Sequence, residues 1–200
     1  MGQHLVSFGT WFLFFVMIER MGELAVGVSG IVRSAYMLIL VPVWSLGSVA
    51  NALTSQLIGR NETEQVWPLL RHITRISYCI IIPLVLVCVL FPQQIAMIYT
   101  EETHLALSSV PAMYVICVGA LAQCFAIILF EAVSGTGNTL MAFLLELGVL
   151  VFYILYIVLT SNVLAMPIAV VWGAEIVYAV LLGIVCFIYL KRSSWQNRQV

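Results

Sequence analysis

Charge is what this 200-residue sequence lacks most. Asp, Glu, Lys and Arg together make up 8% of it, and all of its acidic residues are glutamates. A soluble domain carries roughly 25% charged residues. So few charges cannot cover a water-exposed surface, which excludes an ordinary soluble globular protein. The formal net charge of −1 also provides no basic face for the phosphates of a nucleic acid.

Metal-binding and catalytic motifs are missing as well. There is no HExxH, no GxSxG and no acid pair at catalytic spacing. The cysteines have no CxxC spacing and no nearby histidine, and each lies in an apolar run, so we interpret them as small apolar side chains between helices. They are Cys79, Cys88, Cys117, Cys124 and Cys186. We therefore expect that the protein binds no metal and no organic cofactor, and that it is not an enzyme.

Long hydrophobic runs dominate what is present. Hydrophobic residues make up 63% of the sequence, and its mean hydropathy is +1.11. A membrane-spanning helix needs roughly 20 apolar residues. We predict an all-α polytopic membrane protein, a single bundle of six transmembrane helices covering residues 1–200. The predicted spans are residues 5–18, 28–57, 73–91, 107–133, 140–159 and 168–190.

Short polar connections separate the predicted spans. Residues 59–71 read as a solvated turn, and residues 93–99 as a short amphipathic segment at the membrane surface. The sequence SGTGN at Ser134–Asn138 predicts a tight glycine turn. No connection is long enough to separate two domains.

Basic residues gather on one side of this arrangement. Six of the eight flank the connection between the second and third spans or follow the last span, and Lys and Arg concentrate in cytoplasmic loops. They are Arg60, Arg71, Arg75, Lys191, Arg192 and Arg198. We therefore predict that both termini are cytoplasmic.

The second span is unusual for a helix that meets only lipid. Pro42 interrupts it, and polar or aromatic residues recur every three to four positions along one face: Trp44, Ser48, Asn51 and Ser55. This stripe is predicted to face other helices or a water-filled cavity. Arg33, near the start of the span, either snorkels to the surface beside the loop glutamates or bridges an intramembrane glutamate, and we favour the first interpretation.

Two glutamates within the predicted spans share a helix face with a polar or aromatic residue. An ionisable residue at membrane depth costs roughly 2.5–3.5 kcal/mol on insertion. Glu131 shares a face with Gln123, and either lines a solvated cavity or simply reaches water at the end of its span. Glu146 shares a face with Tyr153. Either the carboxylate and the aromatic ring together attract a cation, or Glu146 is a structural hydrogen-bond partner.

A third glutamate, Glu175, lies between Trp172 and Tyr178. Because Trp and Tyr concentrate at the membrane surface, anchoring of these rings there is the commoner explanation of such a cluster.

Several stretches resemble the multidrug and toxic compound extrusion (MATE) transporters. Leu24-Ala25, Pro42 with Gly47, and Ser55–Gly59 (SQLIG) follow the order of a pattern in that family's seventh and eighth helices. Phe130–Thr139 (FEAVSGTGNT) resembles the turn that closes its tenth helix. The resemblance runs across the whole chain.

The resemblance implies a 12-helix transporter of two six-helix lobes, of which this chain would be the C-terminal lobe. It implies export of drugs or organic cations in exchange for Na⁺ or H⁺, in a bacterial cytoplasmic (inner) membrane. The implied partners are the bilayer, small organic cations and an N-terminal lobe absent from this chain, and the short first span suggests truncation. At the positions where sodium-coupled members of the family have acidic residues, this chain has Ser7 and Gln123. Ion coupling would then depend on the other lobe or on another glutamate.

The candidate residues for the substrate or ion pathway are Trp44, Asn51, Gln123, Glu131, Glu146 and Tyr153. Two alternatives stay open. One is half of a lipid-linked oligosaccharide flippase of the same fold, which would line its cavity with several Arg and Lys, whereas this chain offers only Arg33 for that lining. The other is a non-transporting membrane subunit or an inactive fragment.

Overall fold

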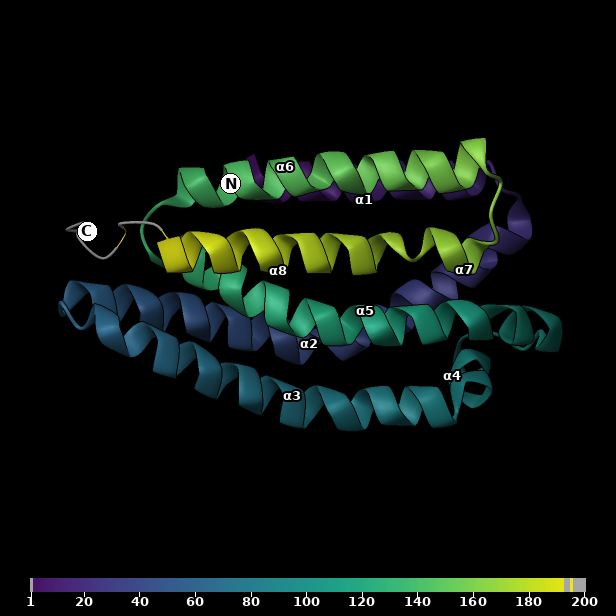
Figure 1. Cartoon of the computed structure of the whole chain (residues 1–200). Coiled ribbons are helices and arrows are strands. Elements are labelled where there is room, and N and C mark those ends of the chain that lie inside the picture. The colour runs from purple at the N-terminus through teal and green to yellow at the C-terminus, as the bar shows by residue number, and fades with distance from the viewer. Residues whose placement is uncertain (1, 193–194, 196–200) are drawn as a thin grey trace.

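The computed structural model describes residues 2–192 and 195, with side chains from Thr10 onward. Within these residues every regular element is a helix, and the long helices run back and forth beside one another (Figure 1). The long helices are α1 (Gly2–Glu19), α2 (Glu23–Gly59), α3 (Val66–Leu90), α5 (Thr103–Gly135), α6 (Thr139–Val158) and α8 (Ala174–Arg192). The short elements are η1 (Thr63–Gln65), α4 (Pro92–Tyr99), η2 (Leu159–Val163) and α7 (Ile168–Val171).

Five helical stretches are long and apolar enough to cross a membrane. They are Glu23–Gly59, Thr63–Leu90, Thr103–Gly135, Thr139–Val163 and Ile168–Arg192. The apolar part of α1 with described side chains, Thr10–Glu19, is shorter. The predicted all-α polytopic membrane protein is thus confirmed, while a sixth span through α1 stays a prediction.

Two elements differ from the sequence prediction. Helix α3 begins at Val66, seven residues before the predicted third span, because Val66 and Leu70 are buried and Pro68 is tolerated in a first helical turn. The predicted solvated turn over residues 59–71 is correspondingly shorter. The predicted last span is also interrupted, since α7 ends at Val171 and α8 begins at Ala174.

Helix α2 continues through Pro42. Proline has no backbone N–H, so it cannot donate the helical hydrogen bond to the carbonyl of the preceding turn. Near it, Ser45 and Ser48 donate from their hydroxyls to the carbonyls of Val41 and Trp44, at 3.1 and 3.2 Å. Inside a bilayer such internal partners replace the water that polar groups would otherwise need.

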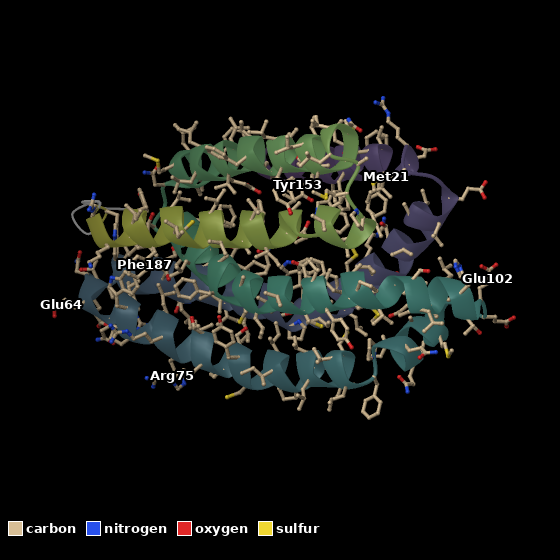
Figure 2. All side chains as sticks on the ribbon, turned by 45° about the vertical axis from the view of Figure 1, so that its right-hand side comes forward. Met21, Glu64, Arg75, Glu102, Tyr153 and Phe187 are labelled. Atoms are coloured by element: carbon tan, nitrogen blue, oxygen red, sulfur yellow. The ribbon has the colours of Figure 1, made fainter. Side chains whose placement is uncertain are left out.

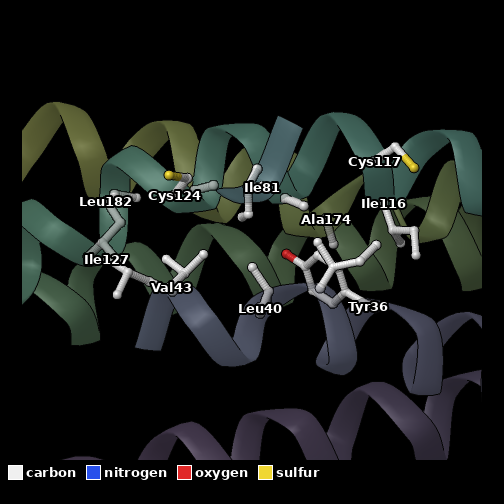
Figure 3. Close-up of a cluster of buried hydrophobic side chains, with 14 of the residues drawn as sticks. Tyr36, Leu40, Val43, Ile81, Ile116, Cys117, Cys124, Ile127, Ala174 and Leu182 are labelled. Atoms are coloured by element: carbon white, nitrogen blue, oxygen red, sulfur yellow. The ribbon is translucent and has the colours of Figure 1, made fainter. Parts of the chain in front are cut away.

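Helix α5 is the centre of the packing, with α2 and α8 as its main neighbours. Figure 3 shows their buried side chains interleaved, with Leu40 and Val43 of α2 facing Ile127 of α5 and Leu182 of α8. Close packing of this kind places polar groups of different helices within hydrogen-bonding distance.

The turn after α5 forms where the sequence predicted it. Gly137 has φ +79°, a conformation that a residue with a side chain rarely adopts, and Asn138 then caps α6 by accepting from the backbone N–H of Met141 at 3.3 Å. The first residue of α1 and the last of α8 lie toward the same end of the bundle (Figure 1).

Candidate functional site

A cavity of about 500 Å³ lies among α1, α2, α5 and α8. We call it the central cavity. Its wall carries aromatic rings and a small number of polar groups. The rings are Trp11, Tyr36, Trp44, Phe130 and Tyr178, and the polar groups are Ser48, Gln123, Glu131 and Glu175. An apolar hollow with a few convergent polar groups is the usual form of a small-molecule site.

Glu131 is held on this wall by α2. Its Oε2 accepts a hydrogen bond from the Nδ2 of Asn51 at 2.8 Å, across 80 residues of sequence. The helices approach closely because Gly47 has no side chain: a Cβ there would lie 3.1 Å from the Cγ of Glu131 and 2.9 Å from Ile127. Glu131 is only partly buried, so a neutral amide holds a carboxylate that still faces the central cavity.

Glu175 is the most deeply buried carboxylate on the cavity wall, with 3% of its surface exposed. Its Oε1 accepts from the hydroxyl of Tyr153 at 2.8 Å, and its Oε2 accepts from the hydroxyl of Tyr36 at 3.3 Å. Figure 3 shows the hydroxyl of Tyr36 pointing from α2 toward the start of α8 at Ala174. Two neutral donors therefore hold both oxygens of one buried carboxyl group.

The break between α7 and α8 sets the position of Glu175. A Cβ on Gly173 would lie 2.8 Å from the hydroxyl of Tyr156, so only glycine admits that hydroxyl, which donates to the carbonyl of Val170 at 3.0 Å. Helix α8 consequently restarts at Ala174, with Glu175 in its first turn. The positive dipole end of a helix favours a carboxylate at this position.

A smaller chamber of about 120 Å³ adjoins the central cavity. We call it the inner chamber; it shares Trp11, Gln123, Glu175 and Tyr178 with the cavity wall. Gln123 is 7% exposed, and among the described side chains its Oε1 accepts no hydrogen bond. Such an acceptor is costly to bury without a donor or a cation beside it.

Glu146 lies beyond Tyr178 and Tyr153 as seen from the inner chamber. It is buried, and its Oε1 accepts from the hydroxyl of Tyr178 at 3.5 Å. The rings of Tyr178 and Tyr153 meet edge to face with centroids 5.8 Å apart. Glu146 is thus linked to the inner chamber through Tyr178, although it does not line either hollow.

Comparison with known families decides what kind of protein carries this site. The family model MatE matches residues 3–171, which is most of the chain. The chain belongs to the MatE family. Comparisons with the curated proteins and with the solved structures gave no significant match.

Members of the MatE family are membrane transporters, and the resemblance to the MATE transporters drawn from the sequence is confirmed. The chain is therefore an integral membrane protein of a transporter family.

The six candidate residues of this MatE chain fall into three groups. Trp44, Gln123 and Glu131 line the central cavity. Tyr153 lines the inner chamber, and Asn51 contacts the cavity wall through Glu131. Glu146 lies behind the wall. Their role in transport stays a prediction.

The interpretation of Trp172 and Glu175 as a cluster at the membrane surface was wrong. Trp172 does not anchor at the membrane surface: it is fully buried, and its indole N–H donates to the hydroxyl of Ser29 at 3.1 Å. The neighbouring Glu175 therefore belongs to the interior. Arg33 is exposed, and its guanidinium lies over the rings of Phe15 and Trp11, at 5.1 and 5.9 Å from their centroids. That it snorkels to the membrane surface stays a prediction.

Sequence reasoning also missed the partners of Glu175 in this MatE chain. Tyr36 lies 139 residues away along the sequence, in α2. The polar stripe predicted for that helix begins at Trp44 and does not include Tyr36. The one available signal was an acidic residue two positions after a glycine within an apolar run, Glu175 after Gly173, where the helix restarts inside the bundle.

Proposed function

We propose that this chain is the C-terminal lobe of a secondary antiporter that exports drugs or organic cations in exchange for Na⁺ or H⁺. One observation carries the proposal: two carboxylates, Glu131 and Glu175, lie on the wall of a single aromatic-lined cavity. Among the described residues lining that cavity and the inner chamber there is no Lys or Arg. The wall therefore favours positive ligands.

Glu131 suits the exported cation. It is partly exposed to the central cavity, and its partner Asn51 is neutral, so its charge stays available. Trp44 lies on the same wall with 45% of its surface exposed. A carboxylate together with an exposed indole attracts an organic cation through its charge and through the face of the ring.

Glu175 suits the coupling ion. It is closed off from bulk solvent, and the inner chamber beside it is large enough for water or a small cation. Tyr153 and Tyr36 orient the carboxylate, and the Oε1 of Gln123 adds a second acceptor facing the same chamber. A proton or a Na⁺ ion there would compensate an otherwise unbalanced buried charge.

The shared wall provides the coupling. Gln123, Glu175 and Tyr178 face both the central cavity and the inner chamber. Two cations in adjoining, poorly hydrated hollows repel each other, so arrival of the ion favours release of the substrate. In a two-lobe transporter, rocking of one lobe against the other would carry the occupied cavity across the bilayer.

The lining also weighs against the flippase alternative. A lipid-linked oligosaccharide has an anionic phosphate group, which needs cationic side chains. Arg33, the basic residue considered for this role, is exposed over aromatic rings rather than part of the cavity wall.

Ethidium accumulation in an efflux-deficient bacterial strain tests the proposal. The chain alone is expected to give no efflux, and coexpression with a matching N-terminal lobe is expected to restore it. In that pair, Glu175→Gln should abolish efflux, because it removes the charge that the ion neutralises. Glu131→Gln should weaken efflux of cationic dyes.

The matched control is Glu101→Gln, in the connection before α5, which should leave efflux unchanged. No rescue by any N-terminal lobe would count against the half-transporter assignment. Unaltered efflux in Glu175→Gln, with the same dependence on pH and Na⁺, would remove Glu175 from the mechanism.

A further inference from the structure

A second hollow of about 500 Å³ lies on another face of α5 and α8, beside α3. We call it the α3–α8 groove. Ala122 and Phe125 of α5 form its floor, Tyr78 forms the α3 side, and α8 lines the rest from Ala179 to Ile188. It is separate from the central cavity: Gln123 and Leu182 line the cavity, whereas Ala122 and Gly183 line the groove.

The groove has the shape of a slot along the helices. Gly183 deepens it, because a Cβ at that position would lie 3.4 Å from the Cδ1 of Phe125 and would fill the space above the floor. From Ala179 to Ile188 the helix rises about 13 Å. The slot therefore runs parallel to the spans, which is also the direction of acyl chains in a bilayer, and its walls are apolar apart from the hydroxyl of Tyr78, which donates to Leu121 at 3.0 Å.

One end of the groove is basic. Phe187 packs edge to face on Trp67 of α3 with centroids 5.5 Å apart, and the Nζ of Lys191 lies 6.0 Å from the centre of the Phe187 ring. Arg71 follows Trp67 by one helical turn and shares a face of α3 with Tyr78. Both Lys191 and Arg71 are exposed. Figure 2 shows Phe187 toward the same end of the molecule as Arg75 and Glu64.

We propose that the α3–α8 groove is a binding site for an anionic phospholipid of the surrounding bilayer. The phosphate lies at Arg71 and Lys191, and one acyl chain occupies the slot from Phe187 to Tyr78. Basic side chains at the membrane surface attract anionic headgroups, and basic pockets between transmembrane helices bind them. One apolar slot with one basic end matches an amphiphile with a single charged head.

The lipid retained by the full-length chain tests this proposal. The chain is reconstituted into vesicles with equal amounts of phosphatidylglycerol and phosphatidylcholine, released into mild detergent, and examined by native mass spectrometry. The wild-type chain is expected to retain phosphatidylglycerol in preference to phosphatidylcholine. Arg71→Gln and Lys191→Gln should each lower that ratio about fivefold.

A variant of the slot separates groove binding from simple attraction at the surface. Ile184→Phe adds bulk to the slot without changing charge, and should lower the amount of both lipids retained. Leu155→Phe, on the exposed face of α6, is its matched control and should retain the wild-type amount. Because the headgroup test uses a ratio of two lipids, a difference in folded protein between variants cancels.

Arg20→Gln, an exposed arginine directly after α1, is the charge control. A loss of preference as large in Arg20→Gln as in Lys191→Gln would overturn the proposal, because general surface charge would explain it. Equal retention of the two lipids by the wild-type chain would also overturn it, as would a specific dimer in which a second copy covers the groove.

Discussion

At the scale of single residues, the three intramembrane glutamates differ in the partner that each one meets. Glu131 accepts from an amide, Glu146 accepts from a hydroxyl at 3.5 Å, and Glu175 accepts from two hydroxyls at 2.8 and 3.3 Å. Only Glu131 remains partly exposed. Three residues of one type therefore lie in three different environments.

The two tyrosines at Glu175 should contribute unequally to stability. Tyr153→Phe is expected to lower the free energy of unfolding by about 1.5–3 kcal/mol, the range for a hydrogen bond to a charged group. Tyr36→Phe is expected to cost less, because its hydroxyl lies 3.3 Å from the carboxylate oxygen rather than 2.8 Å. Denaturant unfolding in detergent micelles measures both, with the exposed Tyr114→Phe as the unchanged control. Equal losses at the two sites would contradict this geometry.

At the scale of helices, close approach between α2 and α5 determines where polar groups meet. Gly135, near the end of α5, lies against the backbone of α2: a Cβ there would lie 2.5 Å from the carbonyl oxygen of Asn51 and 3.1 Å from Thr54. The same residue of α2, Asn51, binds Glu131 one turn earlier on α5. Small residues at helix crossings in membranes allow contacts of this kind.

Gly135→Ala is therefore expected to force α5 away from α2. The expected cost is about 1–3 kcal/mol in the free energy of unfolding, as for overpacking elsewhere. Its matched control is Gly148→Ala in α6, where a Cβ would meet nothing within 4 Å. The control should stabilise the helix slightly, by up to about 1 kcal/mol. Thermal unfolding of both variants in one detergent checks the pair. Equal changes in stability in the two variants would contradict the close contact between α5 and α2.

At the scale of the whole molecule, the helices alternate in direction, and the connections gather at two ends. The loop before α3 and the loop before α5 lie at opposite ends of the bundle, as the labelled Glu64 and Glu102 show in Figure 2. The predicted cytoplasmic location of both termini requires the first of these loops to be cytoplasmic.

Labelling of single cysteines tests this arrangement. In a background with the exposed Cys79 replaced by serine, Glu62→Cys and Glu102→Cys should react with a membrane-impermeant maleimide from opposite sides of the membrane. Glu62→Cys should react only when the cytoplasmic face is accessible, and Glu102→Cys should react in intact cells. Labelling of both from one side would exclude the alternation. Opposite labelling with the two sides exchanged would overturn only the orientation drawn from the basic residues.

The sequence by itself determined the class of protein and most of the helix positions. Low charge and long apolar runs require a bilayer, and the glycine turn at Ser134–Asn138 follows from local backbone preferences. The same local patterns selected Trp44, Gln123 and Glu131, because a polar stripe on an apolar helix needs a polar environment. These properties depend on residues close together along the chain.

Tertiary structure alone decided which carboxylates have partners and where. Glu175 was interpreted as part of a surface anchor, and only packing of α2 and α6 against α8 brings two tyrosine hydroxyls to it. The break that places it in the first turn of α8 depends on the hydroxyl of Tyr156, contributed by α6. The physical reason is that a hydrogen bond acts over about 3 Å, and spacing along one helix does not say which side chain of another helix will lie within that distance.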